Sequence, residues 1–241
     1  MGDEKSVMVG MSGGVDSAAA ALLMQQQGFK VEGVTLHLYG ENFGGGDARR
    51  VCDALGIPHT TLDRRDLFLN RVIEPFADEY TAGKTPNPCV VCNREVKFAV
   101  LAQHAQSRGI TNIATGHYAK TARHGQSGRH LLLRAADIRK DQSYVLYRLP
   151  QEILKMLLLP LGDYTKGEIR AIALEAGLGL SQKADSQDIC FVPDGTMPDF
   201  WKVSAPAGIN PETLLTKTGV FWAGIAVCGI IPSGSGKACR D

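Results

Sequence analysis

A glycine-rich segment near the start of the chain, residues 10–17 (GMSGGVDS), combines residue types that bind phosphate. Glycines let the backbone turn tightly and present N–H groups to an anion, and a following helix adds the positive end of its dipole. Ser12 and Ser17 can donate hydrogen bonds, and Asp16 can help to hold Mg²⁺. Both the Walker A lysine and the GxGxxG spacing are absent. Because no lysine reaches for the γ-phosphate, the segment suits an enzyme that splits ATP between its α- and β-phosphates.

Three cysteines lie in two further segments that could do sulfur chemistry. Cys89 and Cys92 form a Cys-x-x-Cys pair before an expected helix, and Cys190 lies much farther along the chain. A helix start beside cations favours a reactive thiolate, so Cys92 is expected in the N-cap or first turn. A zinc site would need two more ligands, and the histidines do not have that spacing. An iron–sulfur cluster on Cys89, Cys92 and Cys190, with one open iron, is an alternative.

Segments prone to form strands and helices alternate through the first half of the chain. We expect strands at residues 6–10, 31–38, 59–63 and 110–115, and helices at 18–27, 48–55, 68–80 and 94–107. Such alternation is typical of βαβ units on a parallel sheet, where ligands lie beyond the carboxyl ends of the strands. The later pattern indicates a hairpin arm at 131–135 and helices at 142–149 and 169–176. The expected fold is therefore α/β, a Rossmann-like parallel sheet with helices on both faces.

Composition places the chain among globular proteins. Hydrophobic residues make up 44% and charged residues 21%, and no apolar run is long enough to span a membrane. The first residues lack the basic and apolar regions of a secretory signal. In a reducing compartment, cysteines are more often catalytic or metal-binding than paired in a structural framework. We therefore expect a cytoplasmic enzyme. The net charge of +1 excludes no partner, and basic residues between 123 and 140 fit a solvated hairpin by charge alone.

Five segments occur in one order, and together they carry a family resemblance. They are GMSGGVDS at 10–17, TPNPCVVCNREVKF at 85–98, ATGHYA at 114–119, KDQSYVLYRL at 140–149 and DSQDICF at 185–191. The first resembles the PP-loop of the ATP pyrophosphatase superfamily. The whole set, covering residues 6–193, resembles the tRNA-specific 2-thiouridylase family. The resemblance implies a PP-loop (adenine nucleotide α-hydrolase-like) catalytic domain at residues 1–193.

The resemblance also implies a role for each matching residue. ATP would be bound by Gly10, Met11, Ser12, Gly13, Gly14, Val15, Asp16, Ser17, Leu36 and Gly116, with Asp16 on Mg²⁺. The target base would meet Asn87, Pro88 and Cys89, and tRNA would contact Lys140, Asp141 and Gln142. Cys92 would be the catalytic nucleophile, and Cys190 would carry sulfur as a persulfide. We interpret His117 as a pocket-wall or structural residue rather than a base.

The implied reaction is ATP-dependent 2-thiolation of the wobble uridine (position 34) in tRNA. ATP, with Mg²⁺, adenylates the C2 oxygen, and sulfur then replaces AMP. The Cys190 persulfide either attacks C2 directly or yields sulfide after attack by Cys92, which leaves a disulfide for a reductant to reopen. The implied partners are tRNA and a sulfur-donating carrier protein or a cysteine desulfurase. We expect a monomer that does not bind membranes.

Two other functions and an unusual tail complete the expectations. A PP-loop ligase acting on a small molecule would have no use for Cys92 or Cys190, and an inactive, truncated ATP-binding remnant is the other alternative. Residues 194–241 are expected to begin a small β-rich domain. From Gly219 onward they depart from the family pattern. We interpret them as an incomplete second domain with an aberrant tail, which a frameshift upstream of Ile231 would explain.

Overall fold

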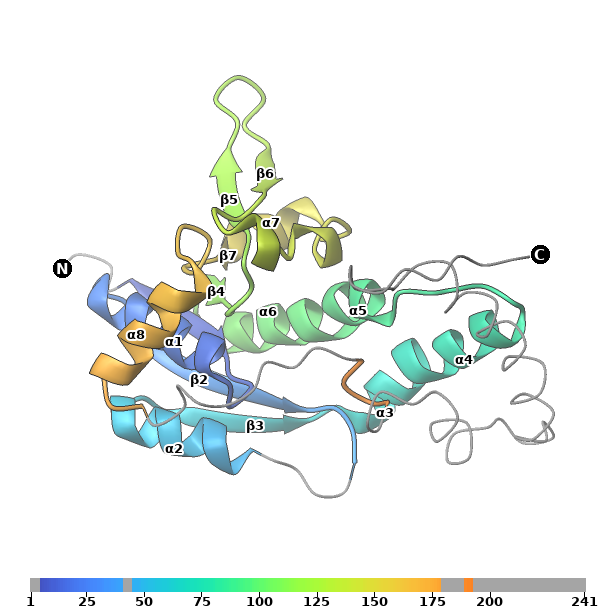
Figure 1. Cartoon of the computed structure of the whole chain (residues 1–241), viewed down its shortest axis with the longest axis horizontal. Coiled ribbons are helices and arrows are strands. Elements are labelled where there is room, and N and C mark those ends of the chain that lie inside the picture. The colour runs from blue at the N-terminus through green and yellow to red at the C-terminus, as the bar shows by residue number, and fades with distance from the viewer. Residues whose placement is uncertain (1–4, 41–44, 179–188, 193–241) are drawn as a thin grey trace, which may run out of the picture. The chain divides into compact units, whose positions relative to one another are not determined.

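The structure is a computed structural model of the 241-residue chain, and it describes residues 5–40, 45–178 and 189–192. Its centre is a five-stranded sheet with the order β3-β2-β1-β4-β7, in which every neighbouring pair is parallel (Figure 1). The strands are β1 (Ser6–Gly10), β2 (Lys30–His37), β3 (His59–Asp63), β4 (Asn112–Ala114) and β7 (Leu157–Leu158). The parallel sheet expected from the sequence is therefore confirmed.

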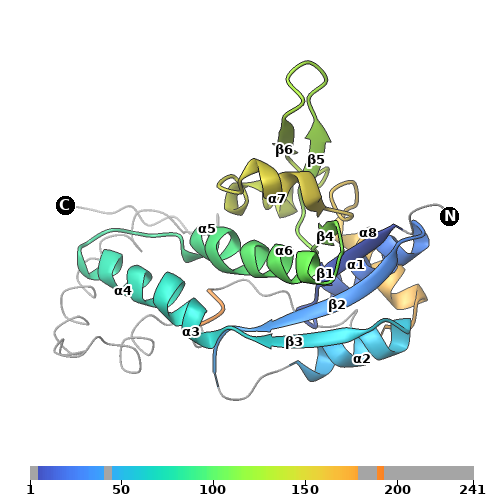
Figure 2. The same cartoon turned by 180° about the vertical axis from the view of Figure 1, so that it is seen from behind.

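Alternating side chains of the central strand supply the two cores on either face of the sheet. Val7 and Val9 pack in one buried cluster with residues of α1 (Val15–Gln26), α2 (Gly46–Leu55) and α8 (Lys166–Glu175). Met8 belongs to the other cluster, with residues of α6 (Phe98–Ser107) and α7 (Gln151–Met156). Figure 2, the view from behind, shows α6 in front of the sheet. Successive side chains of a strand point to opposite faces of the sheet, and here both sets are apolar. Both faces must therefore be covered by helices.

Two long helical runs begin earlier than the sequence predicts. The first joins α3 (Arg65–Phe68), the π-helical turn Leu69–Ile73 and α4 (Glu74–Thr81). The second joins α5 (Pro88–Val91), the π-helical turn Cys92–Lys97 and α6. Pro88 does not break the second run but starts it. A proline at the first helical position has a fixed φ suited to the helix, and its missing N–H would have no partner there.

A two-stranded hairpin and a short turn follow β4. The antiparallel strands β5 (Lys120–Arg123) and β6 (His130–Leu133) form a hairpin that stands away from the sheet (Figure 1). The helix predicted at 142–149 is wrong, because only Ser143–Val145 forms a 3₁₀ turn. The physical reason is a tertiary contact: the side-chain amide of Asn93 donates to the Val145 carbonyl at 3.1 Å. In an α-helix that carbonyl would accept from the Leu149 N–H, which donates to the Leu146 carbonyl instead.

The chain divides into two compact units. One contains Met1–Phe76 and Thr85–Gln187, and the other contains Ala77–Lys84 and Asp188–Asp241. The first unit holds the whole sheet. The predicted β-rich domain and aberrant tail at 194–241 lie outside the described residues, and the predicted boundary at 193 stays a prediction. Within the described ranges, no helix has both the length and the apolar character needed to cross a membrane.

Candidate functional site

The glycine-rich segment forms a compact loop between β1 and α1. Met11 and Val15 are buried and anchor it, while the Ser12 side chain is exposed. Gly13 has a φ of 75°, and a Cβ on it would lie 2.9 Å from the Cβ of Asp47. Glycine is therefore required there by both backbone angle and space. The Ser17 hydroxyl accepts from the Ser12 N–H at 3.1 Å and donates to the Gly14 carbonyl at 3.0 Å, which holds the turn closed.

The start of α1 is suited to bind an anion. Its N-cap residue, Gly14, makes no side-chain capping bond, so the helix start lacks the usual internal acceptor. The N–H groups of the first turn and the positive end of the helix dipole are thus available to phosphate. Asp16 lies in this first turn. The sequence prediction of a phosphate-binding loop has the geometry it needs.

Three predicted nucleotide residues meet at the carboxyl edge of the central strands. Leu36 lies one residue before the end of β2, and Gly116 lies two residues after β4. Strands β2 and β4 are the two neighbours of β1, whose last residue, Gly10, opens the loop. A Cβ on Gly116 would lie 2.6 Å from the backbone carbon of Asp16 and 2.8 Å from the Ser17 nitrogen. Gly116 is therefore needed where the β4 loop touches the α1 start.

Asp16 has protein partners that the sequence analysis missed. The ammonium of Lys166 donates to both of its carboxylate oxygens, at 2.7 and 2.8 Å, and the Tyr118 hydroxyl donates at 2.9 Å. Lys166 is buried at the start of α8, 150 residues from Asp16, and no spacing pattern signals that pairing. This ion pair occupies the position expected for a magnesium ligand, so in this arrangement the carboxylate does not fit a metal. Mg²⁺ binding by Asp16 stays a prediction.

The helix start beyond Thr85 holds the first two cysteines. The Asn87 side chain caps it by accepting from the Cys89 N–H at 3.1 Å, and Pro88 follows as the first helical residue. Cys89 is exposed in the first turn, whereas Cys92 is 5% exposed and lies one turn later. The sequence analysis expected Cys92 in the N-cap or first turn, which is wrong because the helix begins at Pro88. Cys89 is the cysteine at the positive helix end.

This helix run points its start toward the same edge as the phosphate loop. It runs antiparallel to the strands, because a short turn connects the end of α6 to β4. The ring of Phe98, at the start of α6, lies 5.7 Å from the ring of His117, next to Gly116. Cys92 is six residues before Phe98, or roughly 9 Å along a helix. The first unit thus places the phosphate loop and the start of the cysteine helix at the same carboxyl edge of the sheet, although α1 and α6 pack on opposite faces.

The three predicted tRNA-contacting residues bond mainly to the protein itself. The side-chain oxygen of Gln142 accepts from the Tyr118 N–H at 2.9 Å, and the backbone N–H of Gln142 donates to the Tyr118 carbonyl at 2.7 Å. Asp141 accepts from the Ala135 N–H at 2.8 Å and from the Ser143 hydroxyl at 2.6 Å. Partial burial alone would raise the pKa of Asp141, but these hydrogen bonds hold that pKa below its ordinary value. Asp141 and Gln142 therefore shape this segment, and Lys140 is half-buried.

Two polar residues are enclosed at the cysteine helix: His117, which is half-buried against it, and Asn93, which is buried within it. Burial, with a smaller contribution from Lys97, lowers the pKa of His117 to about 3, so its imidazole is neutral, and it hydrogen-bonds Thr115 at 2.9 Å. Such a side chain fits the structural role expected from the sequence better than that of a base at neutral pH. Asn93 is 2% exposed, and its side-chain oxygen has no hydrogen-bond partner in the part of the chain that the structure describes. The sequence analysis did not single out Asn93.

Cys190 belongs to the second unit. It is exposed, whereas the next residue, Phe191, is buried. Its partnership with Cys92 stays a prediction. Among the described residues, no group of three or more His, Cys, Asp or Glu side chains could hold a metal ion. The iron–sulfur alternative is untested by that finding, because the three cysteines fall in different units.

The fold and the loop define the class: a HUP-type α/β domain with a PP-loop at the carboxyl edge of its parallel sheet. The profile of the tRNA methyl transferase HUP domain family matches residues 5–194, and the chain belongs to that family. A solved structure of a 4-thiouridine synthetase–RNA complex with bound ATP shares the fold, with a TM-score of 0.57, 17% identity, and coverage of 95% of this chain and 55% of that one.

Curated relatives carry a more specific name, which agrees with the resemblance found in the sequence. The tRNA-specific 2-thiouridylase MnmA of Carboxydothermus hydrogenoformans is 44% identical over 229 residues, covering 89% of this chain and 63% of the relative. That of Moorella thermoacetica is 47% identical over 225 residues, covering 88% and 63%. The predicted family is confirmed. The chain spans 60–63% of the length of these relatives.

Proposed function

We propose that this chain catalyses ATP-dependent 2-thiolation of the wobble uridine, position 34, in tRNA. The observation that carries the proposal is the shared edge: the uncapped phosphate loop and the helix bearing Cys89 and Cys92 lie in one unit, joined through the Phe98–His117 contact. The names of the relatives supply the substrate class.

In the proposed reaction the loop positions ATP and the cysteines handle sulfur. The N–H groups at the start of α1 stabilise charge on the phosphates while the C2 oxygen of the uridine attacks the α-phosphate and pyrophosphate leaves. The adenylated oxygen is then a good leaving group. The uridine must be splayed out of its base stack to reach this edge. Cys89, in the first turn of α5, is exposed to solvent and would be accessible to the base.

Sulfur then arrives from a Cys190 persulfide by one of two routes. In the first, its outer sulfur attacks C2, AMP leaves, and the Cys92 thiolate breaks the S–S bond to release 2-thiouridine. In the second, Cys92 first releases sulfide, which attacks C2. Both routes leave a Cys92–Cys190 disulfide, so each turnover needs a two-electron reductant and a new sulfur atom. The proposed sulfur source is a carrier protein or a cysteine desulfurase.

The test combines pyrophosphate release with mass analysis of the tRNA nucleosides. We expect pyrophosphate release to depend on unmodified tRNA, and 2-thiouridine to form when a persulfide donor is added. Cys92→Ser and Cys190→Ser should each abolish thiolation while tRNA-dependent pyrophosphate release persists. Cys52→Ala, on the buried face of α2, should retain both activities.

Three results would contradict the proposal or its mechanism. ATP binding without turnover would support the inactive alternative, and release stimulated by a small acid instead of tRNA would support a ligase. Iron and sulfide in protein purified without oxygen, in amounts equal to the protein, would replace the persulfide with a cluster. The mass of the modified nucleoside also distinguishes replacement of oxygen by sulfur from addition of a methyl group, the reaction in the name of the matching family.

A further inference from the structure

Two exposed tyrosines lie beside the cysteine helix, and neither has a role in the reaction described above. Tyr144 is 61% exposed and Tyr147 is 68% exposed. Neither hydroxyl has a hydrogen-bond partner among the residues that the structure describes. A large aromatic ring left in water forgoes the free energy that burial would give it, so two together call for an explanation.

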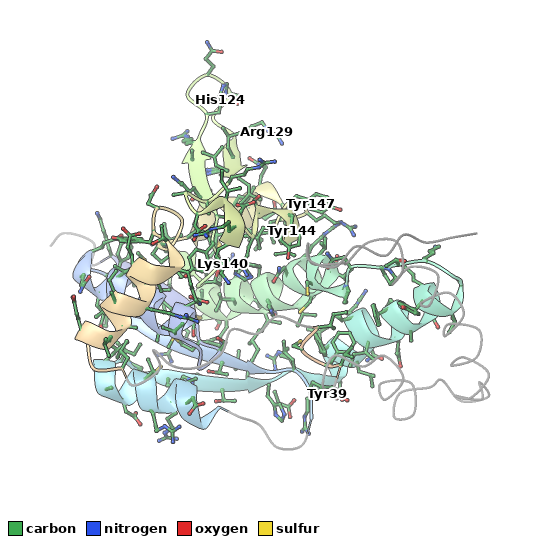
Figure 3. The ribbon with its side chains drawn as sticks, viewed as in Figure 1. Tyr39, His124, Arg129, Lys140, Tyr144 and Tyr147 are labelled. Atoms are coloured by element: carbon green, nitrogen blue, oxygen red, sulfur yellow. The ribbon has the colours of Figure 1, made fainter. Side chains whose placement is uncertain are left out.

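The backbone holds both rings on one side of a firmly anchored segment. Three i→i+3 hydrogen bonds hold this segment in tight turns: the N–H groups of Val145, Leu146 and Leu149 donate to the carbonyls of Gln142, Ser143 and Leu146. The intervening side chains of Val145 and Leu146 are buried, as is Leu149. Figure 3 shows Tyr144 and Tyr147 next to each other above the α6 ribbon. We call residues 142–149 the tyrosine segment.

The tyrosine segment packs directly on the start of the cysteine helix. Its 3₁₀ turn, Ser143–Val145, contacts α5, and Asn93, the residue after Cys92, donates to the Val145 carbonyl at 3.1 Å. The exposed Cys89 is in the first turn of that same α5. The two rings are therefore fixed close to the place where a flipped base would enter.

The region around the tyrosines carries a net positive charge, which favours an anionic partner. Residues 118–158, all of them described, contain eight Lys or Arg against three Asp or Glu, a net charge of +5, whereas the whole chain has +1. Of the three acids, Asp137 is buried and Asp141 is hydrogen-bonded within the segment. Arg148, beside Tyr147, is exposed. Lys120 pairs with Asp163 and Arg139 with Asp137, but the region keeps an excess of cations. Exposed aromatic rings on a surface with excess positive charge are the usual platform for single-stranded nucleic acid, with stacking for the bases and cations for the backbone.

We propose that Tyr144 and Tyr147 form a stacking platform for unpaired RNA bases next to the target uridine, with Arg148 contacting the phosphate backbone. The platform would hold the neighbours of the target base after that base is splayed into the site. This inference rests on the proposed function, since it assumes an RNA substrate at the cysteine helix. It assigns the RNA loop, rather than a protein partner, to this surface.

The experiment measures binding of a fluorescein-labelled, unmodified anticodon stem–loop RNA with uridine at position 34, by anisotropy, to the full chain. Tyr144→Ala and Tyr147→Ala should each weaken binding roughly 5- to 150-fold, the range found when a base-stacking aromatic is removed. Tyr144→Phe and Tyr147→Phe keep the ring and should bind within about twofold of the wild type. Tyr39→Ala is the matched control, an exposed tyrosine that Figure 3 shows well away from the pair.

Four outcomes would overturn the platform, and they are distinguishable. Wild-type binding by both alanine variants removes this inference and leaves the proposed function standing. Unchanged RNA binding with loss of sulfur delivery from a donor protein assigns the surface to that protein. A fall in melting temperature of more than about 5 °C, with equal loss in the phenylalanine variants, makes the tyrosines structural. Failure of the wild type itself to bind the RNA removes the platform and the proposed function together.

Discussion

The nucleotide edge and the tyrosine segment are built in opposite ways. At the nucleotide edge, formed by residues 10–17 with Leu36 and Gly116, polar groups bond inward: Lys166 and Tyr118 hold Asp16, and the loop serines hold each other. In the tyrosine segment the backbone and the aliphatic side chains are anchored, but the two tyrosine rings face water. A site for a small charged ligand gains from groups fixed in advance, whereas a surface for a flexible RNA loop needs exposed area.

The largest effect that would test this contrast is expected from removing the buried ammonium of Lys166. Lys166→Met leaves the Asp16 carboxylate with the Tyr118 hydroxyl alone, and we expect unfolding free energy to fall by about 2–3 kcal/mol, less than for a fully buried pair because the Asp16 side chain is 34% exposed. ATP affinity should fall with it. Urea unfolding and ATP titration measure both, and Lys155→Met, at an exposed lysine, is the control. A loss below about 0.5 kcal/mol would show that the ion pair does not organise the loop.

Close packing at the same edge gives the next prediction. Gly116→Ala places a Cβ 2.6 Å from the Asp16 backbone, which must displace the start of α1, and we expect a loss of about 1–3 kcal/mol together with weaker ATP binding. Gly167→Ala is the matched control, because the atom nearest to its Cβ is 3.9 Å away. Equal stability and ATP affinity in the two variants would contradict the close approach.

The half-buried, neutral imidazole of His117 makes the stability of the nucleotide edge depend on pH. The folded-state pKa of His117 is lowered from 6.5 to about 3, so its contribution is fully present above pH 6.5 and is lost as the pH falls toward 3. Between pH 7 and pH 5 the wild type should lose about 1–2 kcal/mol from this group, and His117→Gln should show a flatter profile. His124→Gln, at the exposed hairpin, should keep the wild-type slope. Matching slopes for His117→Gln and the wild type would refute this assignment.

The smallest expected effect concerns the cap of the cysteine helix, and it tests whether that helix is independent of the nucleotide edge. Asn87→Ala removes the cap of α5 and should cost about 1 kcal/mol, while Asn87→Ser, which can still cap, should cost little. ATP affinity should stay at the wild-type value in both, because Asn87 makes no bond to the phosphate loop that the structure records. Weakened ATP binding in Asn87→Ala would mean that the two regions are coupled.

Local patterns predicted the elements and much of the site. Strands at 6–10 and 59–63 have the predicted bounds, because runs of β-prone residues ended by turn residues are decided locally. The loop GMSGGVDS, Leu36 and Gly116 were placed by motif and meet at one edge as βαβ topology requires. The predicted helix at 142–149 failed, because Asn93 and Tyr118, distant in the chain, bond to that segment.

The sheet, the phosphate loop and the family could all be predicted from the sequence, since they depend on short segments whose residue types strongly favour one local conformation. The start of the cysteine helix at Pro88 also has a local signal, the Asn87 cap followed by proline, which the sequence prediction overlooked. The pairing of Lys166 with Asp16 and the outward position of Tyr144 and Tyr147 depend instead on which distant surfaces come together, and no residue spacing encodes that. Burial and pairing are properties of the packed chain, so they appear only when the chain is folded.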